Sequence, residues 1–270
     1  MRQGTQCRRH NRSPQTYSWR NPGAPIPPKG DNIAPATRNS ACAHTQKPAS
    51  RPDRPVTSKS NTAPARTPTI TIGLRPHIAT QSATQTAALT EDTPPAVRAI
   101  LATMHALPDG GARFVFELEG DRARLPIPPP SPPDTAGAAD ELWQHTCFEV
   151  FVATPGEEAY REFNFSPSGQ WASYAFKGYR ERDEDFTPSA VPSIRFAQRT
   201  DSLTLEAELP AAALPPVAPG ADLRIALSAV IERNDGELEY WAVHHPAAQP
   251  DFHHRDGFVL ILSTAAAEAA

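Results

Sequence analysis

The sequence predicts an all-β protein, an antiparallel β-sandwich of the jelly-roll type that follows a disordered N-terminal arm. Three observations predict it. Roughly ten short β-type runs follow one another after residue 91, no long helical pattern interrupts them, and residues 1–90 have the composition of an unfolded chain. We therefore divide the 270 residues into a disordered arm (1–90), a sandwich domain (91–264) and a frayed tail (265–270).

The β-type runs of the domain are separated by turn-forming residues. Residues 97–106 and 113–119 flank the turn Pro108-Asp109-Gly110-Gly111, and Asn234-Asp235-Gly236 predicts a second hairpin. Short helical turns are expected at 210–214 and just before Trp143, and the Pro-rich segment 125–133 cannot continue a central strand. The other expected strands are 143–153, 160–165, 170–176, 193–197, 202–209, 223–231, 237–243 and 257–262.

The arm and the domain carry opposite charges. Residues 1–90 hold 13 Lys and Arg against two acids, whereas residues 91–270 hold 13 against 28, so a net charge of −4 conceals halves of +11 and −15. The arm also contains 12 of the 31 prolines and no Phe, which leaves too little apolar surface to offset the entropy of ordering. Its basic residues are scattered with few aromatic side chains between them, so we expect no nucleic-acid partner.

Composition also bears on membranes and compartment. No run of 18 apolar residues exists, and residues 1–20 lack the apolar core of a secretory signal, so no membrane partner is expected. The three cysteines, Cys7, Cys42 and Cys147, form no C-x-x-C pair, which argues against a disulfide framework or a zinc knuckle. These features predict a cytoplasmic location.

The expected strand 143–153 is the most informative stretch. Alternation places Thr146, Phe148, Val150 and Val152 on a core face, so that the opposite face carries an indole, an imidazole, a thiol and a carboxylate, from Trp143, His145, Cys147 and Glu149. The next strand presents Tyr160, Glu162 and Asn164 on one face. If the two strands pair, the combined surface suits a sugar, with rings for its C–H faces and polar groups for its hydroxyls. A partly buried polar network joining the strands is the alternative.

Two further tryptophans have two interpretations each. Trp171 follows the turn 166–169 and would either stack on a ligand or fill the core. Trp241, on the strand after the Asn-Asp-Gly turn, has the same two interpretations.

Histidines gather in the Pro-punctuated loop before the last strand. His244, His245, His253 and His254, with Asp251 among them, could chelate a divalent metal ion, or they could hydrogen-bond to backbone groups of a rigid loop.

No catalytic constellation is evident. His145 and Cys147 would lie about 7 Å apart on one strand face, too far for direct proton transfer. The sequence contains no G-x-S-x-G, G-x-G-x-x-G or P-loop motif, and Met104 is the only methionine of the domain that could ligate haem.

Several motifs together resemble a known family. They are Leu142 to Phe151, Glu162 to Trp171, Ala229 to Glu232, Tyr240 to Pro246 and Asp251 to His254. Over roughly residues 95 to 263 the chain is similar to bacterial DOMON-like proteins, relatives of family 9 carbohydrate-binding modules.

The resemblance implies a jelly-roll sandwich and a site in which two tryptophans hold a sugar end while acidic and amide side chains bind its hydroxyls. Trp143 and Glu149 match the Trp and the Glu six residues later, and Asn164 matches the polar position on the next strand. Asn234, Asp235 and Trp241 resemble the later elements, although the spacing departs there. Haem-binding DOMON domains use His and Met ligands.

The sequence therefore predicts a non-catalytic module without a cofactor that binds a saccharide or a similar small polar metabolite. The expected ligand-binding residues are Trp143, His145, Glu149, Asn164, Trp171, Asn234 and Trp241. Two alternatives stay open, a metal-dependent enzyme that uses His244, His245, His253 and His254, and a haem-binding domain.

Overall fold

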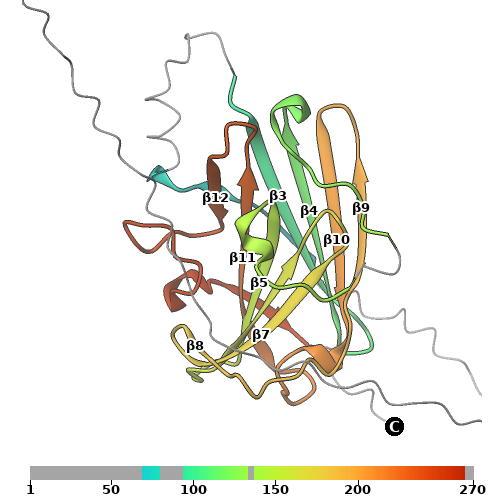
Figure 1. Cartoon of the computed structure of the whole chain (residues 1–270). Helices are drawn as coiled ribbons and strands as arrows, with labels where there is room; N and C mark the ends of the chain where they lie inside the picture. Colours follow the sequence, from blue (N-terminus) through green and yellow to red (C-terminus); the bar gives the residue numbers. More distant parts are fainter. Residues whose placement is uncertain (1–68, 80–93, 133–136, 265–270) are drawn as a thin grey trace, which may run out of the picture. The chain divides into compact units, whose positions relative to one another are not determined.

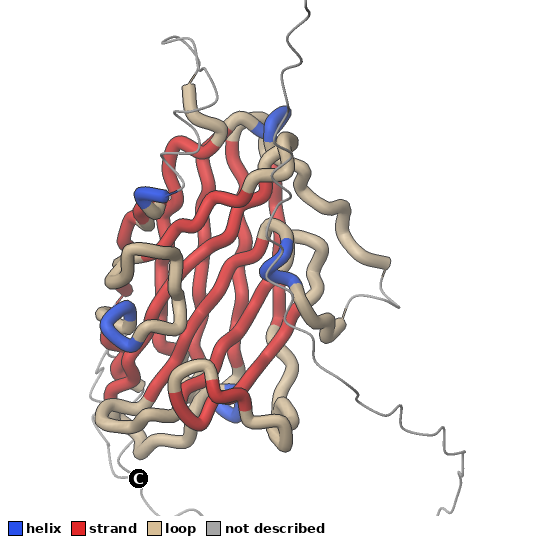
Figure 2. Tube along the Cα trace, turned by 60° about the vertical axis from the view of Figure 1, so that its left-hand side comes forward, coloured by secondary structure: helices blue, strands red, loops and turns tan. Residues whose placement is uncertain are grey.

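A computed structural model of the chain describes residues 69–79, 94–132 and 137–264 (Figure 1). Antiparallel strands form nearly all of its regular structure, and the helical segments in Figure 2 are short turns. The expected all-β, antiparallel sandwich is confirmed. The predicted tail (265–270), and residues 1–68 and 80–93 of the predicted arm, lie outside the described residues, as do Cys7 and Cys42.

The strands form two sheets that face each other. The five-stranded sheet has the order β1 (Thr69–Gly73), β3 (Val97–Ala106), β4 (Ala112–Gly120), β10 (Ser202–Leu209) and β9 (Ser193–Gln198). The eight-stranded sheet has the order β2 (Arg75–Pro76), β12 (Leu238–Ala242), β11 (Asp222–Glu232), β5 (Cys147–Ala153), β6 (Tyr160–Phe165), β7 (Trp171–Gly178) and β8 (Glu181–Arg182), with β13 (Leu260–Ser263) also paired to β11. The 3-10 turns are η1 (Arg122–Arg124), η2 (Leu142–Gln144), η3 (Ala211–Ala213) and η4 (Arg255–Gly257).

The main core lies between the inner faces of the two sheets. Phe148, Val150 and Val152 of β5 are fully buried in it, and the ring of Phe148 lies 5.1 Å from that of Phe116 on β4. Thr146, just before β5, is also buried. The even-numbered residues 146–152 therefore face the core as predicted, because side chains alternate along a strand.

The N-terminal boundary of the domain differs from the prediction. Residues 69–79 were expected to be part of the disordered arm, yet β1 pairs with β3 over five residues and β2 pairs with β12. Leu74 is buried, and the backbone N–H of His77 donates to the carbonyl of Tyr240 over 2.7 Å. The signal was present as the alternation Thr-Ile-Thr-Ile, and the surrounding Pro-rich composition concealed it.

The strand after the Pro-rich loop starts later in the chain than the sequence predicted. Leu142, Trp143 and Gln144 form the 3-10 turn η2, and β5 begins only at Cys147. Glu141, which precedes the turn, has a left-handed backbone with φ of 60°, and the chain changes direction there. Trp143 and His145 are therefore not on the strand face that carries Glu149, and that part of the prediction is wrong.

The remaining loops agree with the turns that the sequence predicts. The hairpin between β11 and β12 turns at Asn234-Asp235-Gly236, where Gly236 has φ of 81°. The expected short helical turn after β10 is η3. The described part of the Pro-rich loop buries Leu125 and bonds to the turn before β7 through Ser131 N–H and the carbonyl of Ser168, over 2.8 Å. In the described part of the chain, no helix is long and apolar enough to cross a bilayer.

Candidate functional site

The outer face of the eight-stranded sheet, which points away from the five-stranded sheet, carries a row of polar side chains. Ser228 of β11, Glu149 of β5 and Asn164 of β6 lie opposite one another in the strand register. Glu162 follows two residues before Asn164 on the same face of β6. We call these four residues the outer-face cluster. The sequence predicted that Glu149, Glu162 and Asn164 would share a face if the strands paired, and the register confirms it.

The loop before β13 lies over this face. Residues 244–258, here called the cover segment, contribute Phe252, His253 and Phe258 to a second apolar layer with Phe151 and Tyr160. Leu142 of η2 joins the same layer. The cluster is consequently closed to solvent, with Glu149 3% exposed, Glu162 5% and Asn164 0%.

One acceptor of the cluster is fully buried and has no hydrogen-bond partner among the described residues. The side-chain amide of Asn164 donates from Nδ2 to Oε1 of Glu162 over 2.8 Å, and Ser228 Oγ donates to Oε2 of Glu149 over 3.3 Å. Among the described residues, Asn164 Oδ1 is buried without a hydrogen-bond partner. A buried unpaired acceptor costs about 1–3 kcal/mol, so this atom marks a place where a donor is missing.

Burial changes the protonation of the groups around the cluster. Desolvation raises the pKa of Glu149 well above its usual value, and the neighbouring Glu162 carboxyl raises it further. Desolvation also raises the pKa of Glu162 to about 7, against the opposing hydrogen bond from Asn164. Burial likewise raises the pKa of the Cys147 thiol, so this cysteine stays protonated and is a poor nucleophile.

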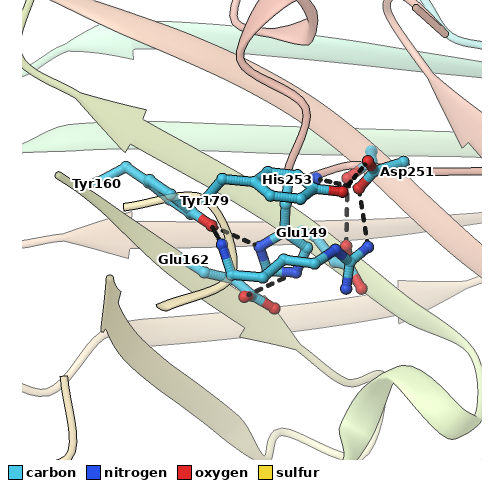
Figure 3. A network of polar contacts seen from close by, with 8 residues as sticks. Glu149, Tyr160, Glu162, Tyr179, Asp251 and His253 are labelled. Atoms are coloured by element: carbon cyan, nitrogen blue, oxygen red, sulfur yellow. Dashed lines mark hydrogen bonds and ion pairs between the residues drawn. The ribbon is translucent and has the colours of Figure 1, made fainter. Parts of the chain in front are cut away.

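His253 contacts the cluster from above and is neutral. Desolvation and, to a smaller extent, the charge of Arg180 lower the pKa of His253 to about 3, against the opposing charge of Asp251. Its Nδ1 shares a 2.8 Å hydrogen bond with the hydroxyl of Tyr160, and its Nε2 lies 3.7 Å from Oε2 of Glu162 (Figure 3). The last distance exceeds that of a hydrogen bond, so His253 does not neutralise Glu162.

Asp251 fixes the cover segment to the loop between β7 and β8. Its carboxylate accepts from the hydroxyl of Tyr179 over 2.7 Å and from Nη2 of Arg180 over 2.8 Å (Figure 3). The backbone N–H of Arg180 in turn donates to the hydroxyl of Tyr160 over 3.1 Å. Sequence reasoning named Asp251 only as a companion of the histidines and missed Tyr179 and Arg180. No local pattern reports a contact between residues about 70 positions apart.

A small cavity of about 10 Å³ lies beside the cluster, lined by Ser228, His244, Asp251 and Phe252 among others. This is about the space that one water molecule needs. A larger ligand therefore requires the cover segment to move.

The structure brings together only part of the predicted site. Glu149 and Asn164 are neighbours, whereas Trp143 is 37% exposed on η2, which lies against β5 and β6. The imidazole of His145 is 68% exposed, and its Nδ1 lies 2.8 Å from Oε2 of Glu232 at the end of β11.

The other three predicted residues lie away from the cluster. Trp171 and Trp241 are buried in the main core, as the alternative interpretation of each had it. Asn234 lies in the β11–β12 turn and donates to the carbonyl of Ala123 over 2.5 Å.

The histidines expected as metal ligands have separate partners. His245 faces His77 edge-on at 4.9 Å and contacts the carbonyl of Arg75, while His253 pairs with Tyr160. His254 accepts from the backbone N–H of Asp256, and His244 is exposed. Within the described ranges, no group of three or more His, Cys, Asp or Glu side chains is arranged to hold a metal ion. Met104, the candidate haem ligand, is buried in the main core.

Comparisons with known proteins gave structural neighbours only. No protein-family model and no curated protein sequence matches the chain. A candidate carbohydrate-binding protein from Bacteroides uniformis is similar in structure, with 12% identity, a TM-score of 0.44, and coverage of 59% of this chain and 77% of that one. A family 9 carbohydrate-binding module from Caldicellulosiruptor kristjanssonii, in complex with glucose, has 8% identity, a TM-score of 0.40, and coverage of 67% and 80%. In complex with cellotriose the corresponding values are 9%, 0.38, 67% and 78%.

Proposed function

We propose that this chain is a non-catalytic module that binds a small polar ligand of the saccharide class at the outer-face cluster. The observation that carries the proposal is the side chain of Asn164. Its Nδ2 is committed to Glu162, and its Oδ1 is buried without a donor among the described residues. A sugar hydroxyl supplies such a donor and removes the cost of the unpaired acceptor.

The surroundings of the cluster fit the rest of a sugar. Aromatic rings of Phe151, Tyr160 and Phe252 border the polar row and offer apolar surface to the C–H faces of a pyranose. Trp143 is exposed on η2, beside the strands that carry Glu149 and Asn164, and we propose that it stacks on the part of the ligand nearest to solvent. The proposal places the site in a closed state, which opens when the cover segment moves.

A titration of the full chain with monosaccharides and short oligosaccharides, followed by calorimetry, tests the proposal. We expect saturable binding, weakened by roughly 10- to 100-fold in Asn164→Ala and in Glu149→Gln, because each loses one or two polar contacts to the ligand.

The matched control is Glu117→Gln, which makes the same chemical change at an exposed position of β4 in the other sheet. Binding that is unchanged in both cluster variants would remove the outer-face cluster as the site. Circular dichroism of each variant distinguishes lost binding from lost folding.

A further inference from the structure

The cover segment is fixed to the eight-stranded sheet at its two ends. Before it, the backbone N–H of Val243 donates to the carbonyl of Leu227 on β11 over 3.1 Å, and after it β13 pairs with residues 222–225 of the same strand. Among the described residues, no backbone–backbone hydrogen bond joins residues 244–258 to another segment. The closed position of this segment therefore depends on its side chains, and few bonds have to break for it to open.

Asp251 makes the strongest of these side-chain attachments. Its carboxylate accepts from the hydroxyl of Tyr179 over 2.7 Å and from Nη2 of Arg180 over 2.8 Å, in the loop between β7 and β8 (Figure 3). Within the part of the chain that the structure describes, it is the only carboxylate of the cover segment that pairs with an arginine or lysine. Its side chain is 13% exposed, so water weakens this charge-assisted bond less than it would at the surface.

The loop that receives Asp251 is itself held in place. Arg180 has a left-handed backbone with φ of 56°, which costs energy for a residue with a side chain. Its backbone N–H donates to the hydroxyl of Tyr160 on β6 over 3.1 Å, and this hydroxyl can donate its own proton to Nδ1 of His253 at 2.8 Å. Tyr160 thus positions the loop and contacts the cover segment at a second point.

The other hydrogen bonds of the cover segment hold its ends and lead to backbone carbonyls. They join His245 to Arg75 at 2.8 Å, His77 to Ala247 at 3.2 Å and Arg255 to Glu157 at 2.9 Å. Asp251 and His253 lie between these ends, and Asp251 also lines the small cavity beside Ser228. The middle of the segment is therefore the part that must lift to admit a ligand.

From this arrangement we propose that Asp251, with Tyr179 and Arg180, forms a latch that controls how often the cover segment opens. The inference adds the regulation of the site to the proposed function and rests on that function for the ligand, whereas opening is a property of the free chain. Because a ligand enters the open form, its rate of association increases with the fraction of the chain that is open.

Hydrogen–deuterium exchange of the ligand-free full chain, read by mass spectrometry of peptides from residues 244–258, measures the opening. Asp251→Asn removes the charge and keeps an oxygen for the backbone N–H of His253, which Asp251 accepts at 3.2 Å. Tyr179→Phe removes a hydroxyl from an exposed ring. We expect exchange in this segment to be roughly 10-fold faster in Asp251→Asn and several-fold faster in Tyr179→Phe, with peptides of β5 and β11 unchanged.

The matched control is Asp256→Asn, which makes the same chemical change in the same segment. The Asp256 side chain is 79% exposed, and its one ion-pair partner among the described residues is His254 of the segment itself. We expect its exchange to equal that of wild type. Unchanged exchange in both latch variants, or equal acceleration in the peptides of β5 and β11, would overturn the latch.

Glucose binding separates the latch from the proposed function. By stopped-flow fluorescence, we expect glucose to associate roughly 10-fold faster with Asp251→Asn than with wild type, because the open fraction is larger by the same factor. Equal association rates would overturn the control of access by the latch and leave the proposed function standing. Faster exchange in the variants without binding of glucose to any of these chains would count against the proposed function and support the latch.

Discussion

The burial of Glu162 changes the protonation of its carboxyl and therefore the stability of the fold. Glu162 is 5% exposed, and its carboxyl accepts a hydrogen bond from Asn164 and lies near the neutral His253. Desolvation raises its pKa from 4.5 to about 7, so the folded protein keeps a proton there that the unfolded chain loses in the same pH range.

The free energy of unfolding should respond to pH accordingly. Since the folded state binds the extra proton, stability should fall as pH rises from about 4.5 to about 7 and then level off. Glu162→Gln lacks this loss, so its stability relative to wild type should rise over that range by up to about 3 kcal/mol. Urea unfolding at a series of pH values measures the difference.

The difference between the wild-type and Glu162→Gln profiles isolates the contribution of Glu162 for two reasons. The lowered pKa of His253 has the opposite effect, a loss of stability as pH falls below 6.5, but it is present in both proteins and cancels in the difference. Glu117→Gln, at an exposed position, should give a pH profile parallel to that of wild type. A parallel profile for Glu162→Gln as well would refute the account of its burial.

The sequence predicted the residue pairing and offered a partly buried polar network as one of two interpretations, but it did not predict which segment covers these residues. Alternation placed Glu149 and Asn164 on matching faces of successive strands, and antiparallel pairing of sequential strands made them neighbours. Their cover comes from Phe252, His253 and Phe258, about 90 or more residues further along the chain. No periodicity within one strand reports on such a distant segment.

At the scale of the element, the short N-terminal strands β1 and β2 belong to different sheets. β1 extends the edge of the five-stranded sheet, β2 extends the edge of the eight-stranded sheet, and Leu74 between them is buried. His77 follows β2, with its Nε2 3.2 Å from the carbonyl of Ala247 in the cover segment. The segment 69–79 therefore joins both sheets to the cover segment.

Removal of this segment should destabilise the sandwich. A chain that starts at residue 80 loses the burial of Leu74 and the packing of Ile70, which we estimate at about 3 kcal/mol, or roughly 6–12 °C in melting temperature. A chain that starts at residue 61 keeps the segment and serves as the control, with a melting temperature close to that of the full chain. Differential scanning calorimetry of the three chains measures their melting temperatures. Equal melting temperatures for all three would contradict the role given to β1 and β2.

The turn η2 shows why a clear sequence pattern can mislead at an element boundary. The alternation that marks β5 continues through Gln144 and His145 in the sequence, yet the chain turns at Glu141 and enters the strand only at Cys147. Strand patterns report which residues could share a face and do not report where pairing begins. Trp143 thus lies beside the strands instead of within one.

The two faces of the eight-stranded sheet pack against different parts of the molecule. The inner face packs Phe148, Val150 and Val152 into the main core, as the sequence predicted. The outer face holds a polar row that the strands alone would expose and that the cover segment buries. Ligand binding therefore requires the cover segment to move, because the present cavity holds no more than about one water molecule.

The side-chain amide of Asn164 is the most direct probe of whether a ligand binds at the outer-face cluster while the cover segment moves. In nitrogen–proton correlation spectra of the full chain, its resonance is assigned as the one absent from Asn164→Ala, and it is then followed during titration with glucose. We predict that it shifts in a saturable manner, together with backbone amides of residues 244–258. Saturable binding that leaves the Asn164 amide and the cover segment unshifted would contradict the account.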